Sequence, residues 1–193
     1  MLLLLTSHFL LLTSDLLLAA AQPLATLESQ VAADPESLKA AADYRQAVIA
    51  AGEYDRAIKV FDGLAARPGA GPHAFLNLGL AYIDKIPSVG AFRRISLGNS
   101  ATAALTRSLE RDPSDLAYLV RGLVNLHFEK GLFHRTPAGV ADLENALRLS
   151  AAHPAQQYVA RIYTALGDGY WRLKHRDRAR ATWRDGQARF PGD

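Results

Sequence analysis

The sequence predicts an all-α protein built as a solenoid of antiparallel helix pairs. Alanine and leucine dominate, aromatic residues make up 8% of the chain, and long β-branched runs are absent, which favours helices over strands. Small and large apolar residues recur at fixed intervals: Gly167 is followed three residues on by Tyr170, twelve on by Ala179 and sixteen on by Trp183. Glycine and proline cluster between apolar segments, as at 67–72. These observations indicate helical hairpins joined by short turns.

Length, cysteine content and charge narrow the classes of function. At 193 residues the chain is one domain or one short repeat array. It has no cysteine, which excludes disulfides, thiolate metal sites, cysteine nucleophiles and lipid attachment through an N-terminal cysteine. The net charge is +3, with arginines concentrated from Arg161 onward. No aromatic-studded basic loop or recognition-helix motif accompanies them, so we interpret them as the solvated faces of the last helices and expect no nucleic-acid partner.

The N-terminal segment 1–21 resembles a secretory signal peptide, because it is leucine-rich and ends in three alanines before Gln22-Pro23. His8 and Asp15 interrupt the apolar run, and no lysine or arginine precedes it. An aspartate near the centre of a membrane helix costs about 2.5–3.5 kcal/mol, which favours a removed signal over an uncleaved anchor; a buried soluble helix or a misassigned start is the third interpretation. We expect a periplasmic or secreted protein, with a cytoplasmic one as the alternative, and membrane contact only through an uncleaved N-terminus.

The segment 22–35 is expected to form a lead-in helix or linker. A helix start follows, because Asp34 can cap, Pro35 suits the first helical position and Glu36 meets the positive end of the helix dipole. This helix should stop at Gly52.

The first hairpin continues with G-E-Y-D-R-A-I-K-V-F, residues 52–61, as its turn and second helix. Its expected packing residues are Tyr54, Ala57 and Phe61. Arg45 stands where the first helix of such a hairpin usually has a small residue.

The second hairpin opens with F-L-N-L-G-L-A-Y, residues 75–82, and crosses its partner at Gly79. The partner helix carries Ala101, Leu105 and Leu109 and ends at Asp112-Pro113. Twenty-two residues separate Gly79 from Ala101, against twelve between Gly167 and Ala179. About ten residues are therefore inserted, within 86–99.

The third hairpin begins at Leu116 and has Gly122 at its crossing. Its second helix places Gly139, Leu143 and Leu147 at the equivalent positions. Gly139 lies seventeen residues after Gly122. About five residues are thus inserted, near 131–137, before the fourth hairpin follows.

These four hairpins, about 36–71, 72–114, 115–153 and 154–191, resemble tetratricopeptide repeats (TPR), with insertions in the second and third. The resemblance is specific in the fourth repeat and weakest in the first and third. It implies a right-handed superhelix with a concave groove lined by the first helix of each repeat. It also implies a non-catalytic scaffold for a protein or peptide partner.

Spacing from the crossing residues predicts which side chains line the groove. They are Asn77, Leu80, Asp84, Leu119, Leu123, Leu126, Asp168, Trp171 and Arg172. TPR domains that clamp a terminal carboxylate use lysines, asparagines and an arginine there; only Asn77 matches, so a carboxylate clamp is not expected. An apolar centre with charged rims suits an amphipathic helix or an extended apolar segment. The alternative is that the insertions fold over the leucines and leave no open groove.

The first insertion is expected to be an ordered loop that offers Phe92, Arg93 and Arg94 to a partner. In that loop Phe92, Ile95 and Leu97 would pack on the repeat edge. The loop lacks the lysine and the spacing of a phosphate-binding P-loop, so no nucleotide is expected.

Catalysis and metal binding have no positive signal in the sequence. His127, Glu129 and His134 lie close together, but two residues of separation on a helix point His127 away from Glu129. We therefore expect no metal, no cofactor and no enzymatic activity. The alternatives to a scaffold are a self-associating protein, because a last apolar face needs covering, and, less favoured, a metal-binding accessory protein.

Overall fold

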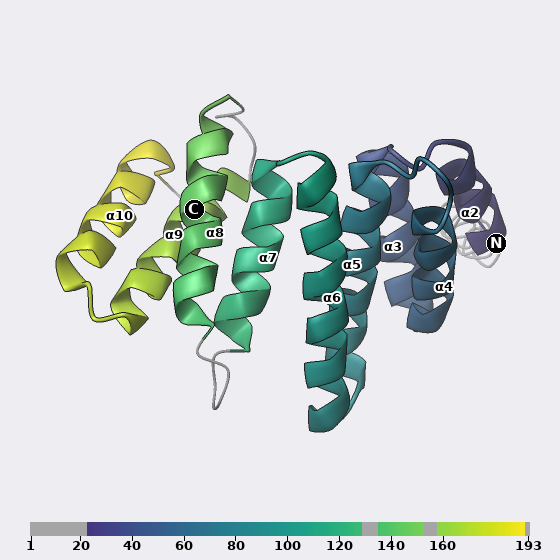
Figure 1. Cartoon of the computed structure of the whole chain (residues 1–193), viewed down its shortest axis with the longest axis horizontal. Coiled ribbons are helices and arrows are strands. Elements are labelled where there is room, and N and C mark those ends of the chain that lie inside the picture. Colours follow the sequence, from purple (N-terminus) through teal and green to yellow (C-terminus); the bar gives the residue numbers. More distant parts are fainter. Residues whose placement is uncertain (1–22, 129–134, 153–157, 192–193) are drawn as a thin grey trace, which may run out of the picture.

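The computed structural model describes residues 23–128, 135–152 and 158–191, which form a row of helices standing side by side (Figure 1). This part of the chain is helical and contains no strand, so the all-α prediction is confirmed. The elements are α2 (Leu24–Ala33), α3 (Leu38–Ala51), α4 (Tyr54–Ala65), α5 (Pro72–Lys85), η1 (Ile86–Ser88), α6 (Ala91–Arg111), α7 (Asp115–His127), α8 (Thr136–Leu149), η2 (Ser150–Ala152), α9 (Tyr158–Arg172) and α10 (Arg176–Arg189).

Consecutive helices pack as antiparallel hairpins, α3–α4, α5–α6, α7–α8 and α9–α10, and the hairpins stack in chain order. The described turns inside the hairpins, and the facing ends of α7 and α8, therefore lie on one edge of the row, the lower edge in Figure 1. We call it the hairpin edge. The connections between hairpins lie on the opposite edge.

The start of α3 differs from the prediction. Ser37 caps the helix, because its Oγ accepts the N–H of Ala40 at 3.2 Å. Asp34 was expected to cap it; its carboxylate instead accepts the N–H of Glu36 at 3.2 Å, in the turn before the helix. The predicted stop is confirmed: Gly52 follows α3 in the left-handed conformation, at a φ of 70°, which favours glycine.

The crossing glycines lie where helices touch. A Cβ added to Gly122 would be 2.9 Å from Cγ of Leu143 and 3.1 Å from the carbonyl oxygen of Gly139. One added to Gly167 would be 2.1 Å from Nε1 of Trp183. The spacing in the sequence thus predicted where the two helices of each hairpin touch, because only glycine, which has no side chain, allows so close an approach.

The core follows the row in three clusters. The first joins α2 to α5 around Tyr44, Phe61 and Phe75, which are 0% exposed. The second joins α5, α6 and α7, and the third joins α7 to α10. Each hairpin therefore buries apolar surface against the next one, as a solenoid requires.

The first insertion is a helix, and the expectation of a loop is wrong. Between Gly90 and Gly98 no proline or glycine interrupts the chain, so α6 gains extra turns and projects beyond its neighbours at the hairpin edge (Figure 1). The ring of Phe128 packs on Gly98, where an added Cβ would be 2.4 Å from Cε2. Nη2 of Arg135 donates to Oδ1 of Asn99 at 2.7 Å. These contacts tie α6 to both ends of the α7–α8 connection.

Two predicted features lie outside the described residues: the signal segment 1–21, and most of the second insertion near 131–137. Among the helices that are described, none has the length and apolar character needed to span a membrane.

Candidate partner-binding surface

The exposed sides of α3, α5, α7 and α9 form the candidate surface, which we call the first-helix face. Helix α3 contacts α5, and α7 contacts α9, beside the contacts within the hairpins. Six predicted groove residues are accessible on these helices. Leu80, Asp84 and Leu123 are partly exposed, and Asp168, Trp171 and Arg172 are exposed.

Three of the predicted groove residues are buried, which corrects their assignment. Asn77 is 1% exposed, Leu119 2% and Leu126 5%. The amide of Asn77 donates to the carbonyl of His73 one turn earlier, at 2.9 Å, and both leucines belong to the core shared with α8 and α9. Spacing placed them on the correct helices but on the side that faces neighbouring helices, so they hold the row together.

Asp84 is engaged by Arg45, the residue that departs from the repeat pattern. Nε of Arg45 donates to Oδ2 at 2.6 Å and Nη2 to Oδ1 at 3.1 Å. Both side chains are 17% exposed. This bidentate pair links α3 to α5 across the first-helix face, so the Asp84 carboxylate already has a partner from its own chain.

The α9 end of this face is aromatic and basic. Trp171 is 42% exposed; the Arg176 guanidinium lies 3.6 Å from its ring centroid, and the Trp183 ring lies 5.7 Å away. Nη1 of Arg172 donates to the carbonyl of Leu126 at 2.5 Å, at the C-terminal end of α7, where a cation stabilises the helix dipole. Arg172 therefore braces α7, while Trp171 stays open to a partner.

The α3 end is mixed in character. Leu38 is 39% exposed and Ile49 41%, with Gln46 exposed between them. Lys39 and Asp43 pair on the same helix at 2.5 Å.

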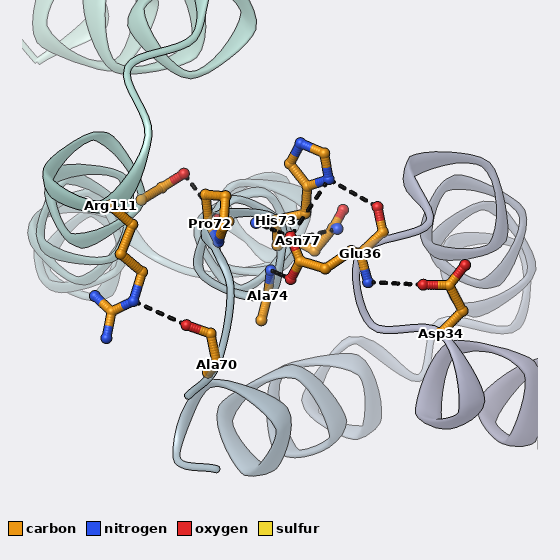
Figure 2. A network of polar contacts seen from close by, with 9 residues as sticks. Asp34, Glu36, Ala70, Pro72, His73, Ala74, Asn77 and Arg111 are labelled. Atoms are coloured by element: carbon orange, nitrogen blue, oxygen red, sulfur yellow. Dashed lines mark hydrogen bonds and ion pairs between the residues drawn. The ribbon is translucent and has the colours of Figure 1, made fainter. Parts of the chain in front are cut away.

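The angle between the first two hairpins is held by a carboxylate. Figure 2 shows Glu36 reaching the start of α5, where it accepts the backbone N–H groups of His73 at 3.1 Å and Ala74 at 3.3 Å. Nδ1 of His73 lies 2.7 Å from the Glu36 carbonyl. A Cβ on Gly71 would lie 2.4 Å from Cδ of Glu36, so that glycine leaves room for the carboxylate. Glu36 thus caps a helix of the next hairpin rather than its own.

Comparison with solved structures shows the same architecture. The chain aligns with TTC0263, a thermophilic TPR protein of Thermus thermophilus, with a TM-score of 0.64 and 20% identity over 88% of this chain and 82% of that one. Two crystal structures of MamA align with TM-scores of 0.61 and 0.60, each at 17% identity and over 86% of this chain, covering 85% and 80% of theirs. The chain has the TPR fold.

The predicted TPR resemblance and right-handed solenoid are thereby confirmed, and at these identities the likeness is one of fold. No family model matches the sequence, and no curated protein sequence matches it. The boundaries of the individual repeats stay a prediction.

Buried tyrosines link neighbouring helices of the TPR framework through their hydroxyl groups. The Tyr170 hydroxyl donates to Glu144 at 2.6 Å, and Nη2 of Arg178 donates to the Tyr170 oxygen at 2.5 Å. Burial, and then the hydrogen bond to Glu144, raise the pKa of Tyr170 to about 12. Burial and Glu28 likewise raise the pKa of Tyr44. These hydroxyls stay protonated at neutral pH and link helices as donors.

The residues weighed for a metal site are not brought together in the described part of the chain. His127 is exposed and packs edge-on against Phe128, with centroids 5.0 Å apart. Glu129 and His134 lie outside the described residues. Within those residues, no three histidine, aspartate or glutamate side chains gather at one point.

Proposed function

We propose that this chain is a non-catalytic scaffold that binds a protein partner on its first-helix face. The observation that supports the proposal is the series of accessible apolar side chains on successive first helices: Ile49, Leu80, Leu123 and Trp171. Hairpins that bury a core against one another hold these side chains at fixed separations. A rigid series of apolar residues with polar neighbours fits an amphipathic helix or an extended apolar segment of the partner.

Export is part of the proposal and is supported by the sequence of residues 1–21, with its apolar run and terminal alanines. N-terminal sequencing of the protein recovered from a periplasmic fraction tests it. A chain that begins at Gln22 is expected; an intact Met1 in the cytoplasm would contradict export.

The role of the first-helix face can be tested in two steps. A partner is first captured with the unmodified protein, and the affinity of that purified partner for variants of the face is then measured. Ile49→Asp and Trp171→Ala are each expected to weaken binding by roughly tenfold or more, as central aromatic and apolar anchors do. Lys59→Ala and Arg184→Ala change exposed residues of second helices and serve as controls. Equal affinity for all four variants would remove the first-helix face from the proposal.

Self-association is the second candidate, favoured by a cavity of about 210 Å³ on the α9–α10 hairpin. Its lining includes the rings of Tyr163, Trp183 and Phe190. In the second and third hairpins the residues at the position of Trp183, Leu105 and Leu143, are 0% exposed under the next helix. Light scattering that shows a monomer at high protein concentration would exclude this candidate.

A further inference from the structure

The projecting start of α6, residues 91–97, exposes apolar side chains to solvent. We call this segment the α6 tip. Phe92 is 92% exposed and Ile95 37%. They are three residues apart and so share one side of the helix. The tip is held in place from Gly98 onward by Phe128 and Arg135, so these side chains project from a rigid base.

The tip is also basic. Arg93 and Arg94 are exposed, and Nε of Arg94 donates to the carbonyl of Val89 at 2.9 Å, which leaves its charge uncompensated. From Ile86 to Leu109 the sequence contains no aspartate or glutamate.

Acidic residues near the tip are already paired. Arg93 borders a cavity together with Glu53 and Asp55. Glu53 accepts a hydrogen bond from Arg56 at 3.0 Å, and Asp55 pairs with Lys85. The positive charge of the tip is therefore open to an outside anion.

A second aromatic and basic patch lies on the same edge, at the α9–α10 turn. Trp171 is 42% exposed, Lys174 is exposed and has a φ of 64°, and Arg176 stacks on the Trp171 ring. Because the α5–α6 and α9–α10 turns both lie on the hairpin edge, this patch and the α6 tip lie on one side of the molecule (Figure 1).

We propose that the hairpin edge, from the α6 tip to the α9–α10 turn, binds an anionic phospholipid surface. Tryptophan is enriched at the level of lipid headgroups, phenylalanine buries at the boundary between headgroups and acyl chains, and arginine and lysine are attracted to anionic lipids. A protein pocket would account for one projecting tip. An extended negatively charged surface accounts for both patches, which belong to different hairpins of one rigid row. The proposal adds a second binding surface, which shares Trp171 with the first-helix face and leaves Ile49, Leu80 and Leu123 free for a protein.

A reporter on the tip itself tests this, because the leucine-rich residues 1–21 can also bring the chain to a vesicle. The native chain has no cysteine, so Ser96→Cys in the full chain accepts an environment-sensitive dye at one place. We expect its emission to shift to the blue with vesicles of equimolar phosphatidylcholine and phosphatidylserine, and not with phosphatidylcholine alone. The same dye at Ala151→Cys, on the opposite edge, should not respond.

Charge and aromatic variants then identify the contact. Replacing both tip arginines, Arg93→Gln and Arg94→Gln, is expected to raise the lipid concentration at half-maximal shift roughly 25-fold, about fivefold per arginine. Phe92→Ala should raise it about tenfold. The pair Lys59→Gln and Arg148→Gln removes the same charge elsewhere and should leave it unchanged.

Three outcomes would overturn the proposal. One is a dye at Ser96→Cys that does not respond to anionic vesicles. Another is an equal response in the tip variant and its charge-matched control. The third is a response to a purified partner protein but not to vesicles, which would assign the tip to a protein surface.

Discussion

Gly122 and Gly63 both lie inside helices, but only Gly122 lies where two helices touch. A Cβ at Gly122 meets Leu143 and the backbone of Gly139, whereas one at Gly63 meets nothing within 4 Å. Gly122→Ala is therefore expected to lower the free energy of unfolding by about 1–3 kcal/mol through overpacking. Gly63→Ala should raise it by about 0.5–1 kcal/mol through helix propensity. Urea unfolding of the two variants measures both changes in the free energy of unfolding. Changes of the same sign would contradict the placement of Gly122 at a helix crossing.

Tyr170 makes stability depend on alkaline pH. Its folded pKa of about 12 lies above the ordinary value of 10, so folding favours the protonated hydroxyl. That contribution is fully present below pH 10 and is lost as the pH rises toward 12. Tyr170→Phe should therefore flatten the loss of stability over this interval in chemical unfolding. An unchanged slope would show that the Tyr170 hydroxyl does not cause the loss of stability at alkaline pH.

Single residues also show which contacts could be predicted from the sequence. The crossing glycines were predictable, because helix contact demands a small residue at a fixed spacing. The Arg45–Asp84 pair was not, since its members are 39 residues apart and each was interpreted by itself. The predicted exposure of Asn77 was wrong because neighbouring positions along a helix point in different directions, so an error of one position moves a side chain from the exposed face into the core.

At the scale of the element, the carboxylate of Glu36 serves as the cap of α5. Glu36→Ala should lower the free energy of unfolding by about 1 kcal/mol, the usual loss for a helix cap. Hydrogen exchange at the amides of His73 and Ala74 should quicken with it. Asp185→Ala, which removes an exposed carboxylate in the middle of α10, is the control and is expected to change stability by less than about 0.5 kcal/mol. Equal losses in the two variants would contradict the cap.

Helix starts and insertions were the least predictable elements. The cap of α3 was assigned to Asp34 from the sequence, whereas Ser37, which stands directly before α3, makes it. The length of the first insertion followed from counting. Its helical conformation could not be predicted in this way, because glycines at both ends of a segment are typical of loops. In the structure Gly90 precedes α6, and Gly98 lies within it against the ring of Phe128.

At the scale of the whole molecule, stability should decline toward the ends of the row. Helix α7 packs on α6, α8 and α9, whereas the main packing of α10 is against α9 and that of α2 is against α3. In a linear array, stability is a sum over neighbour contacts, so amides of α2 and α10 are expected to exchange hydrogen faster than those of α7. Exchange measured helix by helix checks this. Uniform protection would mean that the array unfolds as one unit.

The ring of Phe128 resting on Gly98 also bears on how such arrays diversify. Regular hairpins can be duplicated, deleted or exchanged one at a time, since each needs only a standard neighbour. Here the lengthened helix of one hairpin and the connection of the next have matching shapes. Separating the second hairpin from the third would accordingly leave the projecting start of α6 without the contacts that Phe128 and Arg135 make with it.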